Sequence, residues 1–126
     1  MRIMLKSKIH RATVTGADVN YEGSVTLDPE LMRAADILPY EQVHVVDVDN
    51  GARLVTYAIE GAPAKGEVVL NGAAARLVNP GDIVIIIAYK DVPDSDAASH
   101  KPRLVYVDRQ NKIVRTAHNI HAATSV

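Results

Sequence analysis

The sequence predicts a mainly β protein, a small mixed or parallel-rich β-barrel with one or two short helices. About six or seven short segments are rich in Val and Ile or alternate between polar and apolar residues, as strands do. Turn dipeptides such as Asn-Gly and Pro-Gly separate these segments. Only one segment carries a clear helix-start signal, so strands dominate the prediction.

The first strand is predicted over residues 6–15, where the chain has an extended pattern. Side chains in a strand alternate between its two faces. The alternation therefore places Lys6, Lys8, His10 and Ala12 on one face. This face would gather two lysines and a histidine on a single strand.

Residues 28–38 give the clearest helix. Asp28 suits the N-cap, Pro29 suits the first helical position, and Glu30 lies in the first turn. Leu31, Ala34 and Ala35 would form its apolar stripe.

The rest of the chain reads as hairpins and single strands joined by turns. Asn50-Gly51 predicts a type I′ turn, because that turn needs two residues with positive φ. The remaining elements are a hairpin over 41–61, turns at Asn71-Gly72 and Pro80-Gly81, a buried strand over 83–88, a loop over 93–102, a hairpin over 103–116 and a frayed tail from 119.

Composition bounds both the domain count and the class of protein. With 126 residues, 48% apolar and 23% charged, the chain is predicted to be a single globular domain over 1–126. A net charge of −1 gives no field that would attract nucleic acid or a membrane surface. The chain has no Cys, Phe or Trp, which excludes disulfides and thiolate metal sites and leaves few rings for base stacking. Neither a signal peptide nor a membrane span is readable, so a cytoplasmic location is expected.

The histidines do not predict a metal site. His118 and His121 are three residues apart, but no third ligand accompanies them, so a surface pair is the favoured interpretation. His44 alternates into a strand of valines and is interpreted as structural.

A second group of polar residues lies on the second strand of the first hairpin. Arg53, Val55 and Tyr57 share one face, and Thr56 points to the other. They are either an ordinary strand face or a carboxylate clamp beside a proton donor, since guanidinium binds carboxylates through a planar fork. Thr56 could join such a site only through a strand distortion or across a subunit contact.

Two glycine-containing stretches complete the candidates. The segment Asn71–Arg76 is either a plain turn or a place where small side chains let backbone N–H groups approach a ligand. The dipeptide Gly23-Ser24 means little by itself and is typical of a tight turn.

Three segments together change this interpretation: KIHRATVTGADVNYEGS, NGARLVTYAIEG and NGAAARLVNPGDIVIIIAY. Their order and spacing resemble those of the L-aspartate 1-decarboxylases, a pyruvoyl-dependent family that makes β-alanine for pantothenate and coenzyme A. The resemblance runs from Met1 to about Thr116. It implies a double-psi β-barrel, a homotetramer with active sites between subunits, and L-aspartate as substrate.

The resemblance also implies that the protein cuts its own Gly23–Ser24 bond, giving fragments 1–23 and 24–126. Ser24 would become a pyruvoyl group that forms a Schiff base with the substrate, with no metal and no pyridoxal phosphate. A glycine at position 23 has no Cβ and tolerates a strained backbone, which suits attack by the Ser24 hydroxyl. Some family members need an accessory acetyltransferase-like protein, so a maturation factor is a further candidate partner.

Residue roles follow from the same resemblance. Tyr57 matches the proton donor and Arg53 the carboxylate-binding residue. The other matching positions are the substrate-lining Gly72, Ala73 and Ala74, the neighbouring Lys8 and His10, and Thr56 and Asn71, which are linked to cleavage or catalysis. The rival hypothesis is a non-catalytic interaction module in which Gly23-Ser24 is only a turn.

Overall fold

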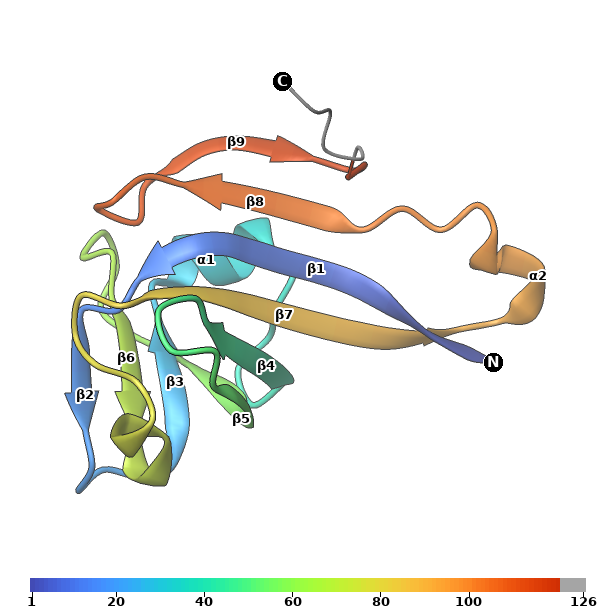
Figure 1. The fold of residues 1–126 in the computed structure, drawn as a ribbon. Coiled ribbons are helices and arrows are strands. Elements are labelled where there is room, and N and C mark those ends of the chain that lie inside the picture. The colour runs from blue at the N-terminus through green and yellow to red at the C-terminus, as the bar shows by residue number, and fades with distance from the viewer. Residues whose placement is uncertain (121–126) are drawn as a thin grey trace.

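The structure is a computed structural model that describes residues 1–120. Over these residues the chain forms nine strands and three short helical segments (Figure 1). The strands are β1 (Arg2–Thr13), β2 (Gly16–Asp18), β3 (Ser24–Leu27), β4 (Gln42–Asp47), β5 (Arg53–Glu60), β6 (Val68–Asn71), β7 (Ile83–Val92), β8 (Arg103–Val107) and β9 (Ile113–Ala117). The helices are α1 (Pro29–Ala34), the 3-10 helix η1 (Gly72–Arg76) and α2 (Asp94–Ala97).

The strands form a mixed sheet in the order β2-β6-β3-β5-β4-β7-β1-β8-β9. The pairs β1–β8, β2–β6 and β3–β5 are parallel, and the other neighbours are antiparallel. The chain passes directly from β1 to β2, two strands far apart in this order, so the sheet must curl (Figure 1). Val14 N–H donates to the Asp82 carbonyl and Thr15 N–H donates to the Val68 carbonyl along this crossing. The prediction of a mainly β protein with one or two short helices is confirmed, with α1 and α2 as the two α-helices, and the arrangement is consistent with a small β-barrel.

One face of each central strand supplies the core, as period-2 alternation predicts. The fully buried side chains come from β1, β3, β4, β5, β6 and β7 and include Ile9, Val25, Leu27, Val43, Val45, Ala58, Leu70, Val84 and Ile86. The alternate residues of the same strands point to the outer face. That outer face carries the polar residues singled out from the sequence.

The prediction for the face of β1 is right for Lys8 and His10 and wrong for Ala12. Ala12 is fully buried, because the register of β1 against β7 shifts between Ile9 and Ala12. Arg11 lies in this β-bulge with a φ of 62°. The extra residue reverses the alternation and turns Ala12 toward the core.

The predicted helix is confirmed but shorter than expected. The Asp28 carboxylate accepts a hydrogen bond from Glu30 N–H, and Pro29 occupies the first helical position. The helix ends at Ala34, and Asp36 follows with a φ of 54°. The 93–102 segment, predicted as a loop, contains the single turn of α2.

Both predicted hairpins are present, but the turn between β4 and β5 is not type I′. Gly51 has a φ of 77°, whereas Asn50 is not in the positive-φ region. The loop is longer than two residues, since Val46 pairs with Arg53, and the Asp47 carboxylate accepts from two of its N–H groups. The hydrogen bonds to the Asp47 carboxylate thus hold the loop without a positive φ at Asn50.

The turn at Pro80-Gly81 is confirmed, with Asp82 N–H donating to the Asn79 carbonyl and Gly81 at a φ of 92°. The strand that follows is buried on one face only, because its residues alternate between buried and half-buried from Ile83 to Ala88. The predicted fraying of the tail from residue 119 concerns mainly residues 121–126, which lie outside the described residues, as does His121.

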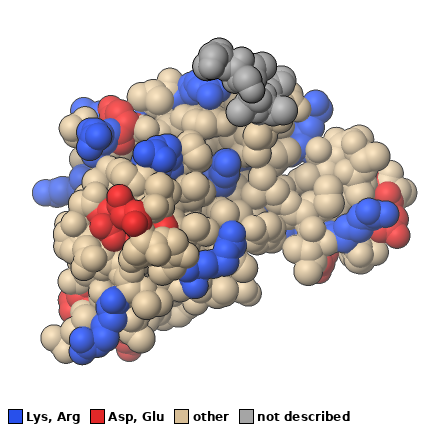
Figure 2. Space-filling view, viewed as in Figure 1, with Lys and Arg blue, Asp and Glu red and all other residues tan. Residues whose placement is uncertain are grey.

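The surface carries charges of both signs, with Lys and Arg spread widely over the face in Figure 2. Within residues 1–120, no helix has the length and apolar character needed to cross a bilayer.

Candidate active site

Ser24 is the first residue of β3 and is almost completely buried, with 1% of its surface exposed. Its hydroxyl donates a hydrogen bond to the Glu22 carbonyl oxygen at 2.9 Å. The adjoining Gly23 is exposed. The Gly23–Ser24 bond therefore lies at the boundary between a surface loop and a buried strand.

Asn71 fixes the Ser24 hydroxyl from the neighbouring strand. The two residues are directly opposite in the antiparallel β3–β6 pair. The Asn71 amide nitrogen donates to the Ser24 hydroxyl oxygen at 3.0 Å and to the Thr26 hydroxyl oxygen at 2.9 Å. Because Asn71 is only 2% exposed, its two amide hydrogens are committed to these two hydroxyls.

The requirement for glycine lies at position 72 rather than at position 23. Gly23 does not have a positive φ, and a Cβ built on it would meet nothing within 4 Å. Gly72 has a φ of 71°, and a Cβ there would lie 2.6 Å from the Gly23 Cα. The tolerance of glycine for an unusual backbone is therefore used at position 72, which makes the close approach to Gly23.

The predicted turn at Asn71-Gly72 opens η1, which carries the three alanines. Ala73 is exposed, Ala74 is half-buried and Ala75 is buried. The exposed Ala73 follows directly on the residue that contacts Gly23. Gly72 and Ala73 are therefore both close to the Gly23–Ser24 bond.

Tyr57 lies on the strand beside Ser24. In the parallel β3–β5 pair Val25 is opposite Ala58, so one step back along the register Ser24 is level with Tyr57. Both belong to the outer face, because Val25 and Ala58 point into the core. Thr56 is opposite the buried Val43 and points to the other face, as predicted.

Arg53 shares the outer face with Tyr57 but lies four residues away along β5, a distance of about 13 Å. Its side chain is exposed, and its guanidinium lies 3.2 Å from the His44 ring nitrogen Nδ1. Since guanidinium only donates, this Nδ1 accepts and the neutral His44 ring carries its proton on Nε2. Within residues 1–120, no carboxylate forms a salt bridge with Arg53. The guanidinium therefore keeps donors free for an anionic ligand.

Lys8 and His10 lie on β1, which β5, β4 and β7 separate from β3. His10 packs edge-to-face on Tyr106, and in the part of the chain that the structure describes its buried Nδ1 has no hydrogen-bond partner. Burial and the nearby Lys8, Arg11 and Arg115 lower the pKa of His10 below its ordinary value of 6.5. His10 is therefore a neutral imidazole near pH 7.

Apart from Thr56, which points to the other face, and Ala74, which packs against the core, the predicted residues fall into two groups within one chain. The first group, around the Gly23–Ser24 bond, consists of Gly23, Ser24, Tyr57, Asn71, Gly72 and Ala73. The second group, here called the cationic group after Arg53 and Lys8, also contains His10 and lies on the outer face of β5 and β1. The two groups are separated within one chain, because β1 lies four strand spacings of about 4.8 Å from β3 along the sheet and Arg53 lies about 13 Å along β5 from Tyr57.

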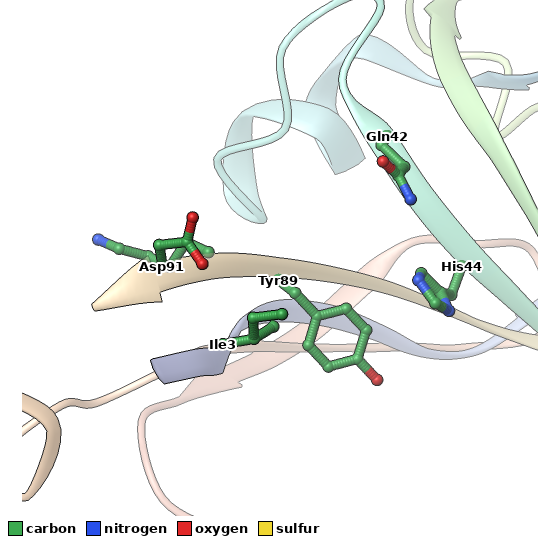
Figure 3. A pocket seen from close by; sticks show the side chains of 6 residues that line it. Ile3, Gln42, His44, Tyr89 and Asp91 are labelled. Atoms are coloured by element: carbon green, nitrogen blue, oxygen red, sulfur yellow. The ribbon is translucent and has the colours of Figure 1, made fainter. Parts of the chain in front are cut away.

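A cavity of about 430 Å³ lies on the outer face beside the cationic group. Figure 3 shows Ile3 and Tyr89 next to one another, with His44 on β4 facing them. The His44 and Tyr89 rings are 5.0 Å apart in an edge-to-face arrangement. None of the residues predicted from the sequence lines this cavity, and His44 connects it to Arg53.

Two residues of the site were missed by sequence reasoning. Thr26 shares the Asn71 amide with Ser24, and its position two residues along the same strand was the available signal. His44 was interpreted as structural, yet it contacts Arg53. The register of the hairpin, which places His44 opposite Val55, would have indicated this contact.

The fold and the site together define a small β-barrel protein with a buried serine held at a Gly-Ser bond and a free guanidinium on the outer face. The sequence model of the aspartate decarboxylase family matches residues 1–114. The chain is also 62% identical over 112 residues to a protein of Rhodopirellula baltica named aspartate 1-decarboxylase, an alignment that covers 89% of this chain and 72% of that protein. The chain belongs to the aspartate decarboxylase family.

Proposed function

We propose that the protein decarboxylates L-aspartate to β-alanine and carbon dioxide, using a pyruvoyl group made from its own Ser24. Family membership and the name of the Rhodopirellula baltica relative support the substrate. The observation that carries the proposal is the buried Ser24 hydroxyl, which Asn71 holds at a strand end while Gly72 packs on Gly23. A plain turn would not need a buried serine with two hydrogen bonds or a glycine at such close approach.

Self-cleavage would begin at this hydroxyl. The Ser24 oxygen forms a bond to the Gly23 carbonyl carbon, the bond from that carbon to the Ser24 nitrogen breaks, and the hydroxyl proton passes to the released amine. Loss of the Ser24 α-proton and of the Gly23 carboxylate leaves a dehydroalanine, which gains water and releases ammonia to give a ketone. Asn71 orients the attacking oxygen, and burial of Ser24 limits competing attack by water.

The proposed ketone would lie at the buried end of β3, where Ser24 stands opposite Asn71 and Gly72 packs on Gly23. When formed, it supplies the electron sink that removal of an α-carboxylate requires, so no pyridoxal phosphate is needed. Tyr57 lies level with residue 24 on the same face and gives a proton to the substrate after carbon dioxide leaves. Arg53 grips a carboxylate of the substrate, since no carboxylate within residues 1–120 forms a salt bridge with its guanidinium.

The proposed assembly is a homotetramer with active sites between subunits. Its support is the separation of the two groups of residues, because Arg53 lies about 13 Å along β5 from Tyr57, the residue level with residue 24. The outer face also exposes apolar residues, with Ile3 at 76% and Val55 at 54% exposure. A second copy would cover these residues and bring its Arg53, Lys8 and His10 to the first copy's residue 24.

We also propose a cellular role for the product and a location for the protein. The β-alanine formed would supply pantothenate and coenzyme A synthesis in the cytoplasm. A maturation factor is proposed as an additional partner, and comparing cleavage of the purified chain alone with cleavage in extract tests whether one is required.

Intact-mass measurement and an assay for β-alanine test the central proposal together. We expect fragments 1–23 and 24–126, the second with a blocked amino terminus, and Ser24→Ala should remain one inactive chain. Tyr57→Phe is the matched variant: it should be cleaved normally yet lose about 10²–10⁴-fold in turnover. An active protein that stays a single full-length chain would refute the self-cleavage.

A further inference from the structure

Three aspartates that sequence reasoning left aside converge at one end of the sheet. Asp47 ends β4, Asp49 lies in the loop to β5, and Asp82 directly precedes β7. One carboxylate oxygen of each lies within 4.8 Å of the others. Asp47 and Asp82 belong to segments 35 positions apart in the sequence, so the fold rather than local sequence makes the cluster.

Backbone N–H groups fix how each carboxylate points. Asp47 uses Oδ1 to accept from the N–H groups of Asp49 and Asn50, at 2.8 and 3.2 Å. One oxygen of Asp49 accepts from Ile83 N–H at 2.8 Å, and one oxygen of Asp82 accepts from Asn79 N–H at 3.0 Å. Each carboxylate is thereby oriented through one oxygen, and within residues 1–120 its second oxygen accepts no backbone hydrogen bond.

The second oxygen of Asp47 is the unusual one. Asp47 is 1% exposed, and its buried Oδ2 has no hydrogen-bond partner among residues 1–120. Burial is the main reason that the pKa of Asp47 is raised, and a contact with Asp82 contributes. No lysine or arginine is among the groups that shift this pKa. A buried carboxylate oxygen in such surroundings needs a proton or a cation to offset its charge.

We propose that Asp47, Asp49 and Asp82 form a binding site for a hard divalent cation of the calcium class. All the donors are oxygens, and neither His nor Cys takes part, which favours Ca²⁺ or Mg²⁺ over zinc. The mutual separations of up to 4.8 Å fit ligands that share one Ca²⁺ ion, whose bonds to oxygen are about 2.4 Å long. Asp49 is exposed and Asp82 half-buried, so the ion can enter from water and keep water ligands.

A cation bound at this site would hold neighbouring segments in place and would take no part in the decarboxylation. The β4–β5 loop leads directly into Arg53, and the segment before β7 follows η1. The Asn50 amide already donates to the Leu77 carbonyl at 2.8 Å, joining the same two segments. A cation bound by residues from both would fix Arg53 relative to the end of the helix that begins at Gly72.

Calorimetric titration of the chelator-treated full chain with CaCl₂, and in parallel with MgCl₂, tests the proposal. We expect one Ca²⁺ per chain and a rise in the unfolding temperature at millimolar Ca²⁺. Asp47→Asn should fold, because its amide oxygen can still accept from Asp49 and Asn50, but it should bind Ca²⁺ at least about tenfold more weakly. Asp49→Asn should weaken binding in the same way.

The matched control is Asp91→Asn, an exposed aspartate on β7 outside the cluster, which should bind Ca²⁺ like the parent chain. Binding that survives unchanged in Asp47→Asn would overturn the proposal. So would a parent chain that neither binds Ca²⁺ or Mg²⁺ nor gains stability from them, and Asp47 would then be neutralised by a proton shared with Asp82. Because these measurements read binding and unfolding, they stand apart from the decarboxylase assay.

Discussion

The amide of Asn71 donates a hydrogen bond of 3.0 Å to the hydroxyl oxygen of Ser24, across a strand pair that joins positions 47 residues apart. Both side chains are buried, so water cannot replace either partner. The same amide also holds Thr26, which makes Asn71 the common anchor of two hydroxyls. The orientation of the residue proposed to attack the chain therefore depends on one distant side chain together with the nearby Glu22 carbonyl.

Asn71→Ala should slow self-cleavage and destabilise the fold. The substitution leaves the buried Ser24 hydroxyl and the half-buried Thr26 hydroxyl without their shared donor. In Ser24→Ala protein only Thr26 loses this donor, and we expect a loss of about 1 kcal/mol there. Mass spectrometry over time gives the cleavage rate, and denaturant unfolding of uncleaved Ser24→Ala protein with and without the change gives the stability. Thr26→Val is the control, since it removes one of the two hydrogen bonds but leaves Ser24 held. Equal cleavage rates in Asn71→Ala and the parent would contradict the anchoring role.

Gly72→Ala and Gly23→Ala should differ sharply in stability. A Cβ at position 72 would lie 2.6 Å from the Gly23 Cα in a residue with φ of 71°, so we expect a loss of about 1–3 kcal/mol. At position 23 a Cβ meets nothing within 4 Å, and the change should stay within about 0.5 kcal/mol. Both are measured as free energies of unfolding on the Ser24→Ala background. A reversed order of the two losses would show that the contact is misplaced.

Arg53→Ala tests which carboxylate the guanidinium holds. Pairing a cation with the departing α-carboxylate would stabilise the ground state, so the side-chain carboxylate is the better partner. The loss in kcat/KM for aspartate should be about 2–5 kcal/mol, as for truncation of one member of a charge pair. Alanine, which lacks that carboxylate, should be a poor substrate that changes little. Arg103→Ala, an exposed arginine on β8, is the control.

The outcome that would contradict this assignment is equally direct. If turnover of alanine falls as far as turnover of aspartate, Arg53 binds the α-carboxylate or serves maturation. Measuring cleavage of Arg53→Ala by mass separates these two cases.

His10 should make the protein less stable as the pH falls. Its folded-state pKa is lowered, first by burial and then by Lys8, Arg11 and Arg115, so the folded chain binds fewer protons than the unfolded chain. The associated stability is present above the ordinary value of 6.5 and is lost as the pH falls through the lowered value. As the pH falls from about 7.5 to about 5, the parent should therefore lose stability relative to His10→Gln.

Denaturant unfolding of both proteins at the two pH values measures the difference, in which the other titrating groups cancel. A constant difference between His10→Gln and the parent would show that the neutral imidazole contributes nothing to the pH dependence.

Local sequence determined several elements of this protein. The cap of α1 was predictable because Asp28 and Pro29 act on their own neighbours within one turn. The shared outer face of Arg53 and Tyr57 was predictable because alternation in a regular strand is a property of the strand alone. The importance of the Gly23-Ser24 dipeptide came from the family resemblance, since nothing in its local sequence distinguishes it from a turn.

The contacts between residues on different strands were decided only by the tertiary structure. The contact of Asn71 with Ser24, the approach of Gly72 to Gly23 and the convergence of Asp47 with Asp82 all depend on the register between strands distant in sequence. The bulge that turns Ala12 inward is likewise a response to packing against β7. Register is set by burial of the whole sheet face, to which every strand contributes, so no single segment carries the information.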